Sequence, residues 1–203
     1  MLAEFGQIIP LGLGPLRQRV PEILEDASNE LPGAFRLLVQ RLLDHLDVLQ
    51  TQIEELDGRI HAWHRANADS QKLEHIPGIG PITASALVAS VGDAAQFSCG
   101  RELSAWMGLV PRQHSSGGKE RLLGISKRGD VYLRTLLIHG ARALVRLAQL
   151  HPERYKWLSA LIGRSNANVA AVALANKNAR IAWAVLARGR PYVANFNPSA
   201  TAA

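Results

Sequence analysis

Apolar residues between positions 35 and 63 recur at alternating intervals of four and three residues. The series is Phe35, Val39, Leu42, Leu46, Leu49, Ile53, Leu56, Ile60 and Trp63. This strict heptad register predicts one amphipathic helix over residues 34–74. A seam only two positions wide per heptad favours packing against another helix. We interpret it as a coiled coil that makes the protein a homo-oligomer through residues 35–63. The alternative is packing against the C-terminal helices of the same chain.

The rest of the chain predicts further helices and no strand, because no stretch alternates convincingly between apolar and polar residues. Residues 1–33 are interrupted by proline and glycine and predict a lead-in of short helices and irregular segments. Residues 75–193 predict a compact helical domain, including a helix that begins at Val131 behind the N-cap Asp130. Residues 194–203 are expected to form a flexible tail. The predicted fold class is therefore all-α.

A turn rich in proline and glycine separates two short helical segments within residues 73–91. It reads Ile76-Pro-Gly-Ile-Gly-Pro. Gly80 can take backbone angles barred to other residues, and Pro81 suits the first turn of the next helix. The spacing resembles a helix-hairpin-helix motif, whose turn offers backbone N–H groups to a DNA phosphate. Gly78 and Gly80 are therefore candidate nucleic-acid-binding residues. The alternative is an ordinary tight helical hairpin.

Charge is divided unevenly along the chain. Residues 1–75 carry 12 acidic and 7 basic side chains, a net charge of −5, whereas residues 76–203 carry 5 acidic and 16 basic, a net charge of +11. This division indicates that only the second half meets a polyanion, for which nucleic acid is the commonest candidate.

Composition narrows the class of protein further. Apolar residues make up 47% and charged residues 20%, which is typical of a globular protein. No apolar stretch approaches the ~18 residues of a membrane-spanning helix, so no membrane association is expected. The chain has a single cysteine, Cys99, and its first residues lack a secretory signal. We expect a cytoplasmic protein.

Two glycine-rich loops between residues 112 and 130 concentrate basic side chains and hydroxyl groups. A flexible backbone, hydroxyls and cations together suit phosphate binding. A serine that attacks DNA also needs cations to neutralise charge on the phosphate oxygens. Ser116 and Ser115 are the candidate catalytic residues, although loop serines usually only satisfy turn hydrogen bonds. The candidate nucleic-acid-binding side chains are Arg112, Lys119, Arg121, Lys127, Arg128 and Arg134.

The helix predicted from Val131 carries apolar and basic residues in turn. Its spacing predicts a buried face that includes Tyr132 and Leu133. Arg134, Arg142 and Arg146 are expected to lie largely outside that face.

The basic half offers little for metal catalysis. A two-metal nuclease needs several convergent carboxylates, and the acidic residues here are few and scattered. They are Asp93, Glu102, Glu120, Asp130 and Glu153. His61, His64 and His75 lack the spacing of a zinc-ligating pair and are interpreted as surface or interface residues. We expect no cofactor in this chain.

The motifs from Ile76 onward resemble those of a known family. They are Ile76-Pro-Gly-Ile-Gly-Pro, Trp106-Met-Gly-Leu-Val-Pro-Arg-Gln-His-Ser-Ser-Gly-Gly-Lys and Gly124-Ile-Ser-Lys-Arg-Gly-Asp-Val-Tyr-Leu-Arg. They resemble the C-terminal domain of insertion-sequence transposases of the DEDD family, typified by insertion sequence 110, and in particular its 1111-type branch. The similarity extends through the coiled-coil region and the closing helix, and covers nearly the whole chain.

The resemblance implies a mechanism that the residues alone do not give. In this family a RuvC-like N-terminal domain with four acidic metal ligands precedes the coiled coil, and a bridge RNA pairs with donor and target DNA. The serine before the glycine of the Ser-Gly motif attacks DNA and forms a covalent link. Here that serine is Ser116, with Ser115 as the second candidate. The implied partners are DNA and a guide RNA, and magnesium is expected only with the N-terminal domain.

One departure from the family pattern stands out. The heptad region begins about 35 residues into the chain, whereas a RuvC-like domain needs on the order of a hundred residues or more. We therefore expect a truncated reading frame or a fragment, without metal-dependent activity of its own. The alternative function belongs to another class: a non-enzymatic, dimeric helix-hairpin-helix module that binds DNA or RNA.

Overall fold

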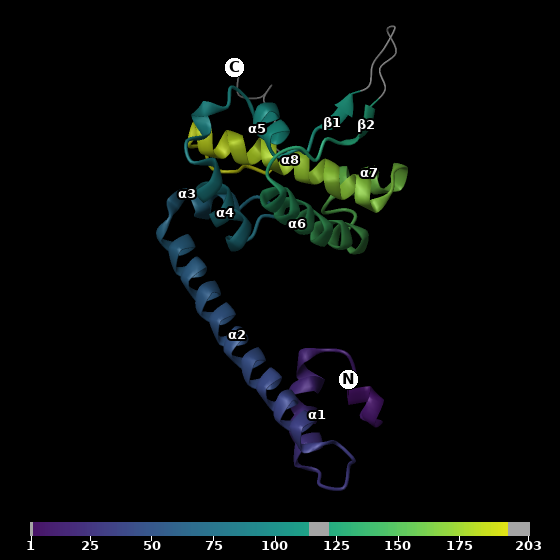
Figure 1. Cartoon of the computed structure of the whole chain (residues 1–203). Helices are drawn as coiled ribbons and strands as arrows, with labels where there is room; N and C mark the ends of the chain where they lie inside the picture. The colour runs from purple at the N-terminus through teal and green to yellow at the C-terminus, as the bar shows by residue number, and fades with distance from the viewer. Residues whose placement is uncertain (1, 114–121, 195–203) are drawn as a thin grey trace, which may run out of the picture. The chain divides into compact units, whose positions relative to one another are not determined.

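Helices dominate residues 2–113 and 122–194, the part of the chain that the computed structural model describes (Figure 1). In chain order the elements are η1 (Leu2–Phe5), α1 (Leu13–Glu25), α2 (Gly33–Ala66), α3 (Ala68–Glu74), α4 (Pro81–Val91), η2 (Ala94–Gln96), α5 (Gly100–Trp106), β1 (Pro111–Gln113), β2 (Leu122–Ile125), α6 (Val131–Leu150), α7 (Lys156–Arg164) and α8 (Ala167–Arg188), where η marks a 3-10 helix. The all-α class is confirmed. The short antiparallel pair β1–β2 is not predicted by the sequence pattern, since each strand is too short to alternate visibly. No described helix is both long and apolar enough to cross a membrane.

The chain divides into two units, Met1–Arg59 and Ile60–Ala203. In the first unit Arg36 of α2 fastens the end of α1, because its guanidinium donates hydrogen bonds to the carbonyl oxygens of Leu24 at 2.7 Å and Leu31 at 3.1 Å. These carbonyls lie at and beyond the last turn of α1, where no intrahelical donor is available. Arg36 therefore substitutes for a cap and fixes the loop that joins the two helices.

The heptad seam of α2 is buried at one end and exposed along most of its length. Val39 is 8% exposed, whereas Leu42, Ile53 and Leu56 are 53%, 53% and 57% exposed. Exposed leucine and isoleucine at regular heptad positions leave apolar area in contact with water. The coiled-coil interpretation remains a prediction.

The single helix expected over residues 34–74 is two helices in the structure. Asn67 interrupts the run with φ −110°, and its side-chain oxygen accepts a hydrogen bond from the backbone N–H of Ser70, which starts α3. His64, interpreted from the sequence as a surface or interface residue, is buried within the chain. Its two ring nitrogens lie 2.7 Å from the Ser70 hydroxyl and 2.9 Å from a carboxylate oxygen of Glu74. These contacts fasten the end of α2 to α3.

The second unit is built around α8, which lies between α5 and α6 (Figure 1). Its core is aliphatic and rich in alanine, which allows these helices to approach closely. Asp130 caps α6 by accepting a hydrogen bond from the N–H of Leu133 at 2.8 Å, as predicted. Gly189, with φ +63°, ends α8.

The buried face of α6 is displaced from the predicted one. The buried apolar residues are Leu133, Leu137, Ala141, Leu144, Val145 and Ala148. This stripe follows the i, i+4 rows, which places Tyr132 beside it rather than in it. Tyr132 is 59% exposed, so its predicted burial is wrong. Arg142 and Arg146 are exposed, as predicted.

Candidate nucleic-acid interface

The turn between α3 and α4 is anchored by two isoleucines. Ile76 and Ile79 are buried in the core of the second unit, and the N–H of Ile79 donates to the carbonyl of Ile76 at 2.9 Å. Pro81 occupies the first helical position of α4, where its missing N–H costs nothing. The N–H of Ala84 then donates to the Gly80 carbonyl at 2.8 Å, which closes the first turn of α4.

The two glycines of this turn serve different purposes. Gly78 has φ +89°, and a Cβ there would lie 2.9 Å from a methyl carbon of Leu144 and 3.2 Å from the Gly140 carbonyl oxygen. Asn178 of α8 donates to the neighbouring Pro77 carbonyl at 2.8 Å. This side of the turn is therefore packed against α6 and α8. Gly78 supports the turn from within, rather than facing a ligand.

Gly80 lies on the open side of the turn. It is exposed, and a Cβ there would meet nothing within 4 Å. The first N–H groups of α4 follow directly, and such groups have no intrahelical acceptor. A phosphate approaching the turn would thus meet Gly80 and the start of α4, while the helix-hairpin-helix interpretation itself stays a prediction.

The strand pair and the residues that follow it carry three of the predicted cations. Pro111 of β1 is paired with Ile125 of β2. Beyond the strands, the N–H of Ser126 donates to the Val110 carbonyl at 2.8 Å and the N–H of Lys127 to the Gly108 carbonyl at 3.1 Å. We call residues 110–113 and 122–128 the hairpin stem. Arg112, Lys127 and Arg128 all lie on it and are all exposed.

A close backbone contact fixes the base of the hairpin stem. Gly129 has φ +119°, and a Cβ there would lie 1.8 Å from the carbonyl oxygen of Trp106. Only glycine allows that approach and that backbone angle together. Lys127, with φ +56°, is the one described non-glycine residue in the left-handed region. The end of α5 therefore sets the position of the cations that precede α6.

The hairpin stem carries positive charge that the described residues do not neutralise. Arg112, Lys127 and Arg128 make no ion pair with any acidic side chain in residues 2–113 and 122–194. Guanidinium and ammonium groups left without a carboxylate are suited to bind phosphate. The arrangement can hold an anionic backbone beside the segment that joins the two strands.

Arg134 does not belong to this exposed group. It is only 8% exposed, and its guanidinium donates to the Met107 carbonyl at 3.0 Å and to the Asp130 carbonyl at 3.4 Å. The prediction that it lies outside the packed face of α6 is wrong, because it satisfies the free carbonyl at the end of α5. Arg134 positions the hairpin stem and has no outward guanidinium to offer a nucleic acid.

The remaining candidates fall on residues 114–121, which lie outside the described residues. They are Ser115, Ser116, Lys119 and Arg121. Their positions in the sequence place them between the end of β1 at Gln113 and the start of β2 at Leu122.

Two residues that sequence reasoning missed lock the α3–α4 turn. Gly140 lies inside α6, and a Cβ there would lie 1.9 Å from the Gly78 carbonyl oxygen. Asn178 is buried, and its side-chain amide donates a hydrogen bond to the carbonyl oxygen of Pro77. The glycine was a readable signal, because a glycine inside a helical pattern often marks a close approach. The asparagine gave no such signal.

The described part of the chain brings together no three His, Cys, Asp or Glu side chains that could hold a metal ion.

Comparison with known proteins assigns part of the second unit to a protein family. Residues 70–156 match the family described as Transposase IS116/IS110/IS902 family. The chain carries a transposase domain of this family. The matched stretch includes the α3–α4 turn, the hairpin stem and all of α6, so every candidate residue named above lies inside the transposase domain.

Curated relatives match this chain well beyond residues 70–156. A "Probable family 20 transposase" of Pseudomonas aeruginosa is 50% identical over 95% of this chain and 57% of its own length. The "Transposase for insertion sequence element IS1111A" of Coxiella burnetii is 46% identical over 95% of this chain and 53% of its own length. The corresponding transposase of element IS1328 from Yersinia enterocolitica is 41% identical over 93% of this chain and 56% of its own length. The chain thus spans about half the length of these curated relatives.

Proposed function

We propose that this chain is the part of a DNA transposase that binds DNA and supplies a serine nucleophile for strand cleavage and exchange. One observation carries the proposal: Arg112, Lys127 and Arg128 are all exposed on the stem of the hairpin, and the sequence between its strands contains Ser115 and Ser116. Membership of the transposase family supports the same reading. The proposed nucleophile is Ser116, with Ser115 as the second candidate.

The proposed step exchanges one phosphate ester for another. The serine oxygen attacks phosphorus, a new O–P bond forms, and the P–O bond to one deoxyribose breaks. The hydroxyl proton of the serine ends on the released deoxyribose oxygen, so the step needs no oxidant, reductant or added nucleotide. Negative charge on the phosphate oxygens rises in the transition state, and the cations of the hairpin stem stabilise it. Ester energy is retained in the serine–phosphate bond, which allows the strand to be rejoined to a new end.

Gly80 and the start of α4 have a separate part in the proposal. Contacts from backbone N–H groups to phosphate are independent of base sequence. Target choice in the proposed reaction therefore comes from a guide RNA paired with DNA, while this chain holds the backbone. The charges of Arg112 and Lys127 attract phosphate in the same sequence-independent way.

A DNA substrate with a strand break beside the crossover tests the proposal. The break lets the released end diffuse away, so the serine–DNA link accumulates as an adduct that survives denaturing electrophoresis. We expect the adduct when the chain is joined to the N-terminal part of the Pseudomonas aeruginosa relative. If DNA binds with a steep salt dependence and no adduct forms in either the chain or the fusion, the non-enzymatic binding module is the correct function.

We further propose that α2 pairs with α2 of a second chain. The exposed seam residues Leu42, Ile53 and Leu56 support this, because a parallel or antiparallel partner helix would remove them from water.

Replacing Ile53 by lysine is expected to convert the oligomer to a monomer. A charge in the middle of the seam loses the burial of the isoleucine and places an ammonium group in an apolar interface. Sedimentation equilibrium measures the mass directly. Thr51→Lys is the matched control, because Thr51 is exposed and lies two residues away, off the seam. Pairing through α2 is wrong if both variants keep the mass of the original protein.

A further inference from the structure

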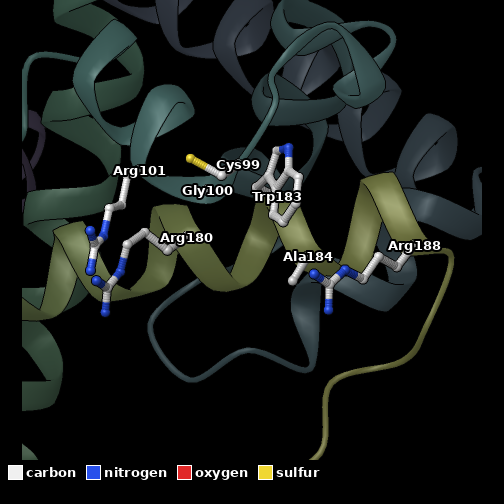
Figure 2. Close-up of a pocket in the computed structure, with 7 residues that line it drawn as sticks. All are labelled: Cys99, Gly100, Arg101, Arg180, Trp183, Ala184 and Arg188. Atoms are coloured by element: carbon white, nitrogen blue, oxygen red, sulfur yellow. The ribbon is translucent and has the colours of Figure 1, made fainter. Parts of the chain in front are cut away.

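A shallow hollow of about 370 Å³ lies between α5 and α8, away from the hairpin stem (Figure 2). Its lining consists of Cys99, Gly100, Arg101, Arg180, Trp183, Ala184 and Arg188. Three of these seven residues are arginines, and none is acidic. Arg180, Ala184 and Arg188 follow one another at intervals of four, so they share one face of α8. The small Ala184 between two long side chains leaves the space open.

A close helix contact brings the third arginine into place. A Cβ on Gly100 would lie 2.9 Å from both the Cα and the carbonyl oxygen of Arg180. The start of α5 therefore rests directly on the backbone of α8. Arg101 follows at once, and its side chain extends on the same side as that of Arg180 (Figure 2). Two guanidinium groups thus face the same solvent region from different helices.

The charge of this group is not balanced by the described acidic residues. No ion pair joins Arg101, Arg180 or Arg188 to a carboxylate in the parts of the chain that the structure describes. Glu102 is next in sequence, but its carboxylate accepts hydrogen bonds from the backbone N–H and the hydroxyl of Ser98, at 2.6 and 2.7 Å. Burial, and then the charge of Arg180, lower the pKa of Lys177 one turn away. Among the described residues, the three guanidinium groups therefore give the hollow a positive charge that suits an anion.

Trp183 gives the hollow a rigid aromatic wall. Its indole N–H donates to the carbonyl oxygens of Ala94 at 3.2 Å and Phe97 at 3.0 Å, which holds the ring in one orientation. The guanidinium carbon of Arg188 lies 5.5 Å from the centre of the ring. Fixed aromatic rings beside arginines are the features on which unpaired bases stack. A duplex keeps its base faces stacked inside and exposes only base edges, sugars and phosphates.

We propose that the hollow between α5 and α8 binds an unpaired nucleic-acid strand, with a phosphate between Arg101 and Arg180 and a base against Trp183. This rests on the proposed function, which supplies nucleic acid as the partner, but it adds a second contact site separate from the α3–α4 turn and the hairpin stem. Phosphate and base are common to DNA and RNA, so the strand is identified by its unpaired state, and the test separates the two sources.

Cys99 provides a direct probe of the hollow. It is the only cysteine in the chain, it lines the hollow, and it is exposed. Hydrogen bonds from the backbone N–H groups of Glu102 and Arg101 lower the pKa of its thiol, which favours the reactive thiolate. Iodoacetamide is uncharged, so a bound polyanion does not repel it. The rate of Cys99 alkylation, read by mass spectrometry, therefore reports occupation of the hollow.

The experiment compares the alkylation rate of the whole chain with and without saturating oligothymidine, oligouridine or a duplex, each of about 20 nucleotides, longer than the ~4–16 that single-strand sites cover. We expect a single strand to slow alkylation several-fold and the duplex to leave it unchanged. The strand that protects at the lower concentration identifies the source. Arg101→Ala with Arg180→Ala should abolish protection and reduce the salt slope of single-strand binding by about 0.7, the value expected for the loss of one phosphate contact.

Arg142→Ala with Arg146→Ala is the matched control. Both side chains are exposed on α6, and the pair removes the same two charges without touching the hollow. Protection must survive in this variant. Mobility shift in the same samples separates the two proposals. Nucleic-acid binding without protection of Cys99, or equal protection by the duplex, contradicts single-strand binding in the hollow and leaves the proposed function standing. Failure of every nucleic acid to bind overturns both.

Discussion

Ser116→Ala is expected to abolish the covalent protein–DNA adduct, while Ser115→Ala retains it. The substitution removes one hydroxyl and leaves the backbone and the Cβ in place. Without the serine oxygen no O–P bond can form, so the adduct falls to background rather than by a modest factor. The measurement is the fraction of labelled DNA that stays attached to protein after denaturation.

Binding provides the control for the serine substitutions. Neither serine carries charge, so both variants should bind DNA with unchanged affinity and salt dependence, since phosphate charge dominates both. Loss of the adduct in Ser115→Ala but not in Ser116→Ala would assign the nucleophile to Ser115. An adduct of normal yield in the double serine variant would exclude the serine mechanism altogether.

Gly140→Ala is expected to lower the free energy of unfolding by roughly 3 kcal/mol, although alanine is the better helix former. A Cβ at Gly140 would lie 1.9 Å from the Gly78 carbonyl oxygen, which is backbone and cannot rotate away. The α3–α4 turn and α6 must separate to admit it. This movement also exposes Ile76 and Ile79, which are buried beneath the turn. Urea denaturation followed by circular dichroism measures the change.

Gly58→Ala is the same chemical change, but it is expected to raise the free energy of unfolding instead of lowering it. Gly58 lies inside α2, and a Cβ there would meet nothing within 4 Å. Helix propensity alone then acts, and the free energy of unfolding should rise by up to about 1 kcal/mol. If Gly140→Ala also stabilises the protein, the close approach of α6 to Gly78 is wrong.

The sequence predicts best those features that depend on local chemistry. Asp130 as a cap for α6 and the all-α class both follow from signals that are local in the sequence. Side-chain direction was less predictable where a distant partner decides it. Arg134 is buried because the carbonyl of Met107, 27 residues earlier, needs a donor. No periodicity within α6 contains that information.

The candidate interface divides in the same way. Arg112, Lys127 and Arg128 could be chosen from charge and neighbouring glycines, and the structure brings them onto one hairpin stem. The hollow between α5 and α8 could not be foreseen, because Arg101 and Arg180 are far apart in sequence. Their meeting depends on Gly100, whose lack of a side chain gives no hint of what it touches.

Helix α5 ends at Trp106, whose carbonyl meets Gly129 at the hairpin stem, and begins at Gly100 on the edge of the hollow. Its seven residues span only about 10 Å at 1.5 Å per residue. This short helix therefore holds the hollow and the hairpin stem at a fixed and short separation. If a strand binds in the hollow as proposed, it is held at high local concentration near the hairpin stem, and the two contacts then strengthen each other.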